Sequence, residues 1–147
     1  MREELPKSSA QRYARVAGWL LVALGIAGFF YNSSFATGHE TLTNRDAVFG
    51  AFDVNGWHNL LHLLAGLIGV RVARSYAGSR AYAYAAGLFF LLLALLGALY
   101  GDGDSIFKLF PVNTGDDVLH LVLGLAGLLA ATLTSPTPAP SHVARTG

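Results

Sequence analysis

Long apolar runs separated by short polar segments dominate the chain. Four runs approach the about 20 residues that a helix needs to cross a bilayer, and they cover about residues 14–31, 56–73, 81–100 and 117–133. Runs of this length are too long for ordinary strands and too apolar for the surface helices of a water-soluble protein. The pattern predicts an all-α membrane protein built as a four-transmembrane-helix bundle.

Composition agrees with a lipid environment and excludes several classes of function. Hydrophobic residues make up 53% of the sequence and charged residues only 13%, against about a quarter charged in soluble domains. The net charge of +1 provides no basic field that would attract nucleic acid. Because the chain has no cysteine, it can form no disulfide, iron–sulfur cluster or thiolate zinc site, and it has no cysteine nucleophile.

The distribution of Lys and Arg predicts the orientation, because short cytoplasmic loops collect these residues. Eight of the ten basic residues fall on the side of the two termini: Arg2, Lys7, Arg12, Arg15, Arg71, Arg74, Arg80 and Arg145. The opposite side holds Arg45 and Lys108 together with seven of the nine acids. We therefore expect a multi-pass protein of the bacterial plasma membrane with both termini in the cytoplasm. A cleavable signal peptide is the alternative for the first run, and the length of its apolar stretch disfavours it.

The predicted domain boundaries follow from these runs. A short cytoplasmic segment (1–12) precedes the transmembrane domain (13–134), and a flexible cytoplasmic tail rich in Pro, Ser and Thr (135–147) follows it. The transmembrane domain divides into two similar halves, about 13–74 and 80–134.

Identical residues at fixed spacings indicate that the two halves are an internal repeat. At a shift of 58 residues, Asn55, His62, Gly66 and Gly69 fall on Asn113, His120, Gly124 and Gly127. The first and third runs align at a shift of 69, which places Gly18 on Gly87 and Gly28 on Gly97. The difference between the shifts is an insertion in the first outer loop. Because each copy begins on the cytoplasmic side, we expect two parallel two-helix repeats about an axis along the membrane normal.

The second and fourth predicted helices carry polar and small residues on one face. Relative to His62 and His120, an asparagine lies at −7, Asn59 or Asp117 lies at −3, and glycines lie at +4 and +7. Small residues mark the contact surface of membrane helices, so the predicted packing positions are Gly66, Gly69, Gly124 and Gly127. With the two histidines facing each other, the predicted polar cluster consists of Asn55, His58, Asn59, Asn113, Asp116 and Asp117.

The motifs Asn59-Leu-Leu-His62 and Asp117-Val-Leu-His120, each followed by two glycines, carry a family resemblance. Together with Pro111-Val-Asn113 they resemble the bacterial four-helix membrane family catalogued as domain of unknown function 4383. The similarity covers nearly the whole chain between the two termini. It implies a fold and a topology, not an activity. One position departs from the family, which usually has Asn after the Asp of the last motif, where this chain has Asp116 and Asp117.

Three interpretations of His62 and His120 remain open. As a structural pair, they would hydrogen-bond the polar face of the other repeat, at Asn59 or Asp117, and fix helix register. As a cofactor site, they would ligate haem b from facing helices, with the glycines leaving room for the macrocycle. As a metal or proton site, they would act with Asp117 and His58, because imidazole and carboxylate suit both roles.

The sequence favours a non-enzymatic structural or accessory membrane component. A b-type haem electron-transfer subunit and a metal- or proton-binding membrane protein are the alternatives. No pattern in the chain is a specific catalytic signature: Ser33, His39 and Glu40 in the first outer loop are residues that any polar loop contains. The expected partners are the lipid bilayer and a second copy of the chain or a larger membrane complex, and not nucleic acid.

Overall fold

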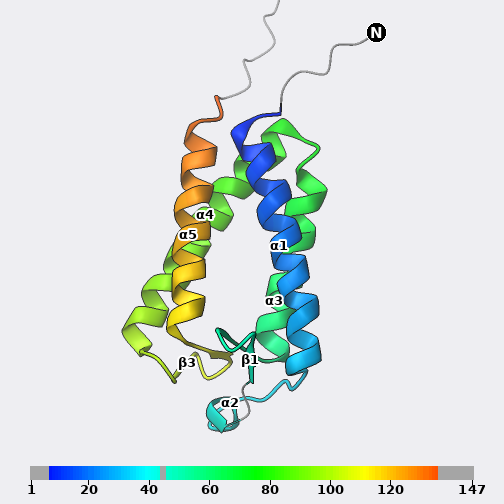
Figure 1. The fold of residues 1–147 in the computed structure, drawn as a ribbon. Coiled ribbons are helices and arrows are strands. Elements are labelled where there is room, and N and C mark those ends of the chain that lie inside the picture. Colours follow the sequence, from blue (N-terminus) through cyan, green and yellow to red (C-terminus); the bar gives the residue numbers. More distant parts are fainter. Residues whose placement is uncertain (1–6, 44–45, 136–147) are drawn as a thin grey trace, which may run out of the picture.

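The computed structural model describes residues 7–43 and 46–135 (Figure 1). Within these residues, four long helices run side by side: α1 (Ser9–Tyr31), α3 (Gly56–Val72), α4 (Tyr76–Tyr100) and α5 (Thr114–Thr132). The short helix α2 (Glu40–Thr43) and two small hairpins gather at the end of the bundle away from the termini. The first residues of the predicted N-terminal segment and nearly all of the predicted tail lie outside the described residues.

Helix caps explain why two helices begin earlier than the hydrophobic pattern predicted. Ser8 and Gln11 form a capping box at the start of α1, in which the Ser8 side chain accepts from the Gln11 backbone and the Gln11 side chain accepts from the Ser8 backbone. Ser75 caps α4 by accepting from the backbone of Gly78. These caps place the first turns of α1 and α4 ahead of the apolar runs, in segments that hydropathy alone assigns to loops.

Two antiparallel hairpins were not expected in an all-α chain. Strand β1 (Asp46–Val48) pairs with β2 (Phe52–Val54), and β3 (Ser105–Ile106) pairs with β4 (Phe110–Pro111). Strands of two or three residues are too short for an alternating pattern to be visible in the sequence. Their turns also lack the usual Asn-Gly signal, although Phe49 and Phe107 take matching φ values of 54° and 53°.

Each hairpin precedes a long helix, and glycines hold the helices in two close antiparallel pairs. Helix α1 packs mainly on α3, and α4 packs mainly on α5. A Cβ atom added to Gly18 would lie 2.9 Å from the carbonyl oxygen of Gly66, and one added to Gly87 would lie 3.1 Å from that of Gly124. In both pairs, therefore, backbone meets backbone at a glycine.

Two tyrosines join one helix pair to the other. Tyr13 of α1 donates its hydroxyl hydrogen to the carbonyl oxygen of Leu123 in α5, and Tyr82 of α4 donates to that of Ala65 in α3, both at 3.0 Å. The two rings lie 6.2 Å apart, centroid to centroid. The glycines Gly69 and Gly127 pack against these rings, since an added Cβ would lie 2.7 Å from the Tyr82 hydroxyl and 2.9 Å from the Tyr13 hydroxyl respectively.

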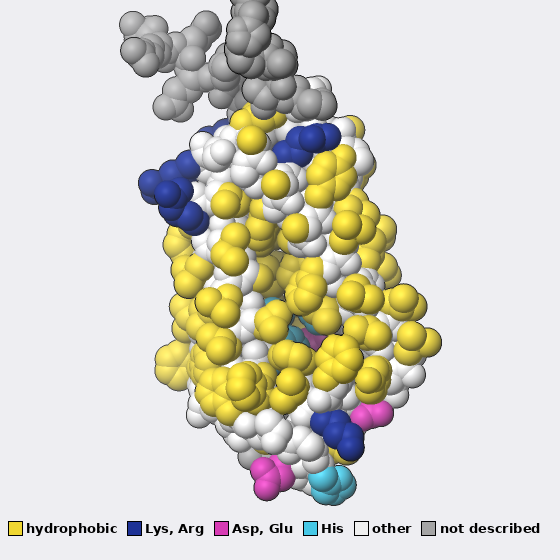
Figure 2. Space-filling model, turned by 180° about the vertical axis from the view of Figure 1, so that it is seen from behind, with side chains coloured by type: hydrophobic (Ala, Val, Ile, Leu, Met, Phe, Trp, Pro, Cys, Tyr) yellow, Lys and Arg dark blue, Asp and Glu magenta, His cyan; other side chains and the backbone are white. Residues whose placement is uncertain are grey.

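The outside of the bundle is apolar along its length, as expected for a surface that contacts lipid. Large side chains that are more than half exposed include Val16, Leu64, Leu67, Leu88, Leu95, Leu125 and Leu129. Figure 2 shows this apolar band between basic side chains at one end and charged side chains of both signs at the other. Three helices of the described residues, α1, α4 and α5, are long and apolar enough to cross a membrane, and α3 is shorter, with 17 residues.

Candidate functional site

Three histidines meet inside the bundle, near the end that carries the hairpins. His58 and His62 lie one turn apart on α3, and His120 comes from α5. One ring nitrogen from each histidine lies within 4.8 Å of those of the other two. The ring centroids are 4.4 Å apart for His58 and His62 and 6.2 Å apart for His62 and His120. All three side chains are buried, with at most 6% exposed.

The starts of α3 and α5 determine which residues turn inward. The side chain of Asn55 caps α3 by accepting from the backbone of His58 at 3.0 Å, and Asn113 caps α5 by accepting from the backbone of Asp116 at 2.9 Å. The residue three positions after each cap is buried: His58 in one helix and Asp116 in the other. The two caps therefore place an imidazole and a carboxyl group at corresponding positions on the two helices.

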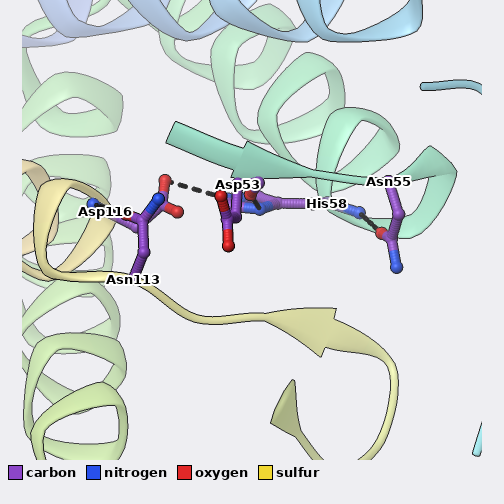
Figure 3. A network of polar contacts seen from close by, with 5 residues as sticks. All are labelled: Asp53, Asn55, His58, Asn113 and Asp116. Carbon is purple, nitrogen blue, oxygen red and sulfur yellow. Dashed lines mark hydrogen bonds and ion pairs between the residues drawn. The ribbon is translucent and has the colours of Figure 1, made fainter. Parts of the chain in front are cut away.

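The hydrogen bond of His58 determines which of its nitrogens is available. Its Nδ1 lies 2.9 Å from the carbonyl oxygen of Asp53. A carbonyl oxygen only accepts, so Nδ1 carries the hydrogen, and the Nε2 of the neutral ring keeps its lone pair. That Nε2 lies 4.0 Å from Oδ1 of Asp116, and Figure 3 shows the chain of contacts from Asn55 through His58 to Asp116. A backbone carbonyl that orients a histidine in this way is typical of metal-ligating imidazoles.

Several polar atoms of the site are buried without a hydrogen-bond partner among the described residues. They are Nδ1 and Nε2 of His62, Nε2 of His120, and both carboxyl oxygens of Asp116. Buried polar side-chain atoms are normally paired, and several unpaired ones in one cluster call for an explanation. They lie close enough together to share one bound group.

A cavity of about 160 Å³ adjoins the cluster. Its polar lining consists of His58, His62, His120, Asp116 and Asp117, and the rest of its wall is apolar, with Leu61, Ala65, Phe89, Phe90, Leu93 and Phe110 among the lining residues. In Figure 2, histidine and acidic side chains are visible at the bottom of a hollow in the apolar surface. The site is therefore reached from the side of the bundle.

The structure separates the sequence-predicted site residues into three groups. His58, His62, His120 and Asp116 come together. Asn55 and Asn113 are helix caps, and Asn55 also donates from Nδ2 to the carbonyl oxygen of Leu109 at 2.6 Å.

Asn59 and Asp117 occupy corresponding places within their own helix pairs. Asn59 packs on Gly28 and donates to the carbonyl oxygen of Asn32 at 2.7 Å, and Asp117 packs on Gly97. In the described part of the chain, no hydrogen bond or ion pair joins either residue to a histidine. The expected approach of His62 to His120 is present. Among the described residues, the two ring nitrogens of His62 and Nε2 of His120 do not form the expected hydrogen bond to the polar face of the other half.

Sequence reasoning underestimated His58 and missed both Tyr13 and Tyr82. His58 and Asp116 were both in the predicted polar cluster, but the metal interpretation added His58 to a site built on Asp117, whereas the structure places it beside Asp116. A signal for the tyrosines was available, because the shift of 69 residues places Tyr13 on Tyr82. The role of the Asp53 carbonyl had no such signal, since a backbone group leaves no trace in the residue type.

Comparison with known proteins gives one family. No curated protein and no solved structure matches the chain. A family model described as "Domain of unknown function (DUF4383)" matches residues 11–133, which include all four long helices except the first residues of α1. The chain therefore belongs to the DUF4383 family of proteins of unknown function.

Proposed function

We propose that this chain is a four-helix membrane protein, built from two parallel repeats with both termini in the cytoplasm, that binds one divalent transition-metal ion between the repeats. Helix α3 is the fourth span, because its 17 residues reach the lower end of the length that crosses a bilayer. Two features support the repeat. The glycine contacts match in the two helix pairs, and Tyr13 and Tyr82 each donate a hydrogen bond to the other pair.

The metal proposal rests on the convergence of His58, His62 and His120. Ring nitrogens of His62 and His120 have no hydrogen-bond partner among the described residues, and the hydrogen bond from Nδ1 of His58 leaves its Nε2 available. Three imidazoles suit zinc, copper, iron and nickel. Around zinc, nitrogens at about 2.0–2.1 Å from the ion lie about 3.4 Å from one another. The present separations of up to 4.8 Å would have to contract by about 1.4 Å, through rotation of the side chains, when an ion binds. Asp116 beside His58 balances the charge of the ion.

The same geometry disfavours the two other interpretations of the histidines. A pair that only fixed helix register would be hydrogen-bonded, and the nitrogens of His62 have no partner among the described residues. A haem needs a pocket in the size range of larger ligands, about 300–1,000 Å³, and the cavity has about 160 Å³. Three histidines that converge on one point are suited to an ion rather than to opposite faces of a macrocycle.

Metal content measured by mass spectrometry tests the proposal directly. The protein is purified in detergent after treatment with a chelator, incubated with Zn²⁺, and washed. We expect one equivalent of zinc in the wild type and less than a tenth of that in His62→Gln and His120→Gln. His39→Gln is the matched control, because His39 is exposed and remote from the cluster.

Equal zinc content in all four proteins, or no retention of Zn²⁺, Fe²⁺ or Cu²⁺ by the wild type, would refute the metal site. The absorption spectrum separates the haem alternative. Protein expressed with added haem is expected to show no Soret band.

Cysteine labelling tests the orientation, and the natural chain contains no cysteine to interfere. The exposed positions Glu40 and Asp104 lie at the end of the bundle that carries the hairpins, and exposed Ala77 lies at the other end. In intact cells, an impermeant thiol reagent is expected to label Glu40→Cys and Asp104→Cys but not Ala77→Cys. Labelling of Ala77→Cys alone would reverse the orientation.

A further inference from the structure

We propose that the cavity beside the histidines binds a small lipid-soluble alcohol or phenol that enters sideways from the bilayer. This inference goes beyond the metal site: the ligand's hydroxyl group would meet the polar end of the cavity whether or not an ion is bound there. Three features of the molecule support such a ligand: an asymmetry between the helix pairs, the direction of the opening, and the chemistry of the walls.

The asymmetry lies at Ala65 and Leu123, which correspond at the shift of 58 residues. Both backbone carbonyls accept a tyrosine hydroxyl from the other helix pair at 3.0 Å. The side chains differ: Ala65 lines the cavity, whereas the larger Leu123 is buried, with 6% exposed. The cavity therefore lies beside the small methyl side chain of Ala65. At the corresponding position of the other helix pair, the larger side chain of Leu123 is buried.

The opening faces the apolar surface of the bundle and not its charged ends. Figure 2 shows the hollow within the band of apolar side chains. Phe89 and Phe107, which line the cavity, are also exposed to the outside, at 39% and 65%. A molecule that reaches the histidines through this opening comes from the hydrocarbon region, so it must be soluble in lipid.

The walls select an apolar body with one polar group. Phe89, Phe90 and Phe110 surround a volume of about 160 Å³, close to the roughly 150 Å³ of a cavity that holds benzene. At the inner end, His62 offers an unpaired ring nitrogen and Asp116 offers unpaired carboxyl oxygens. A hydroxyl group can donate to either of them, and its oxygen can also occupy the open position of a metal held by three histidines.

Fluorine NMR of protein in lipid nanodiscs tests the site with 4-(trifluoromethyl)phenol. The wild type is expected to show one saturable site, displaced by 4-propylphenol but not by propylbenzene, which lacks the hydroxyl group. Ala65→Leu is expected to weaken binding at least tenfold while leaving the fold intact, because Leu123 is already accommodated at the corresponding position. Leu64→Phe, on the exposed side of the same helix, changes the lipid-facing surface and is expected to bind like the wild type.

A second filling variant, Leu93→Trp, blocks the cavity from its α4 wall and is expected to reproduce the loss seen with Ala65→Leu. Equal binding by the wild type and both filled variants would overturn the inference, and so would the absence of a saturable site. The titration is run on chelator-treated and on zinc-loaded protein. Zinc retention without phenol binding refutes this inference alone, and phenol binding without zinc retention refutes the metal site alone.

Discussion

The two helix pairs make the same packing contacts but differ at the site. In α1–α3 and in α4–α5, a glycine meets a backbone carbonyl at matching positions, and each pair sends one tyrosine to the other. At the centre the match ends: His58 stands where the second pair has Asp116, and Ala65 stands where it has Leu123. The comparison indicates that the shared residues build the scaffold and that the substituted ones build the site.

The largest effect is expected from breaking the shared scaffold. Gly66→Leu and Gly124→Leu place a side chain where an added Cβ would lie 2.7 Å from the Gly18 carbonyl oxygen or 2.6 Å from the Leu91 side chain. Overpacking typically costs about 1–3 kcal/mol of unfolding free energy, and the upper end is expected here because the helix backbones approach each other at these glycines. Thermal unfolding in detergent measures the loss, which should be similar for both variants.

Leu67→Phe and Leu125→Phe are the matched controls, because both side chains are 55% exposed on the outer side of the same helices. They are expected to change stability by less than about 0.5 kcal/mol. If the glycine and leucine variants were equally tolerated, the glycine faces would not be the contact surfaces of the two pairs.

The scaffold was largely predictable from the sequence because it depends on residue types that recur. Apolar length indicates the helices, and the recurrence of Gly66 at Gly124 indicates their contact face. The start of α1 at Ser9 was not predicted, because it depends on side-chain to backbone bonds between Ser8 and Gln11. The hairpins were missed for a similar reason, since backbone pairing over two or three residues needs no special sequence.

The site was less predictable, because it depends on side-chain direction at single-residue precision. Asp116 and Asp117 are neighbours, yet one points toward His58 and the other packs on Gly97. A rotation of 100° per residue on a helix separates these two environments. The position of the Asn113 cap decides between them, and hydropathy does not locate a cap that closely.

An intermediate effect is expected from removing the carboxyl group that distinguishes the second pair. Asp116→Asn keeps the shape of the side chain but removes the carboxylate that lies 4.0 Å from His58 Nε2. Loss of a neighbour of this kind usually lowers metal affinity by about 10- to 100-fold. Competition with a zinc-sensitive dye measures the affinity. Asp117→Asn is the control, and if it weakened zinc binding as much as Asp116→Asn, the assignment of Asp116 to the site would be wrong.

The smallest effect is expected from Tyr13 and Tyr82, through which each helix pair donates a hydrogen bond to the other. These residues test whether the two pairs lose the same stability. Tyr13→Phe and Tyr82→Phe each remove one hydroxyl group and leave the ring in place against Gly127 or Gly69. Hydrogen bonds between membrane helices contribute about 0.6 kcal/mol on average and about 1.7 kcal/mol at most. Because both hydroxyl groups donate at 3.0 Å to a helix carbonyl, the two variants should lose nearly the same unfolding free energy.

The double variant extends this test, since the rings lie 6.2 Å apart and share no hydrogen bond. Any departure of its loss from the sum of the single losses measures the coupling between the two tyrosines, because additivity holds only for sites more than about 7–10 Å apart. Tyr31→Phe, at an exposed position of α1, is the control and should unfold like the wild type. The substitutions leave the packing around each ring unchanged. If the losses of unfolding free energy at Tyr13 and Tyr82 differed by more than the error of the measurement, the two hydrogen bonds between the pairs would not contribute equally.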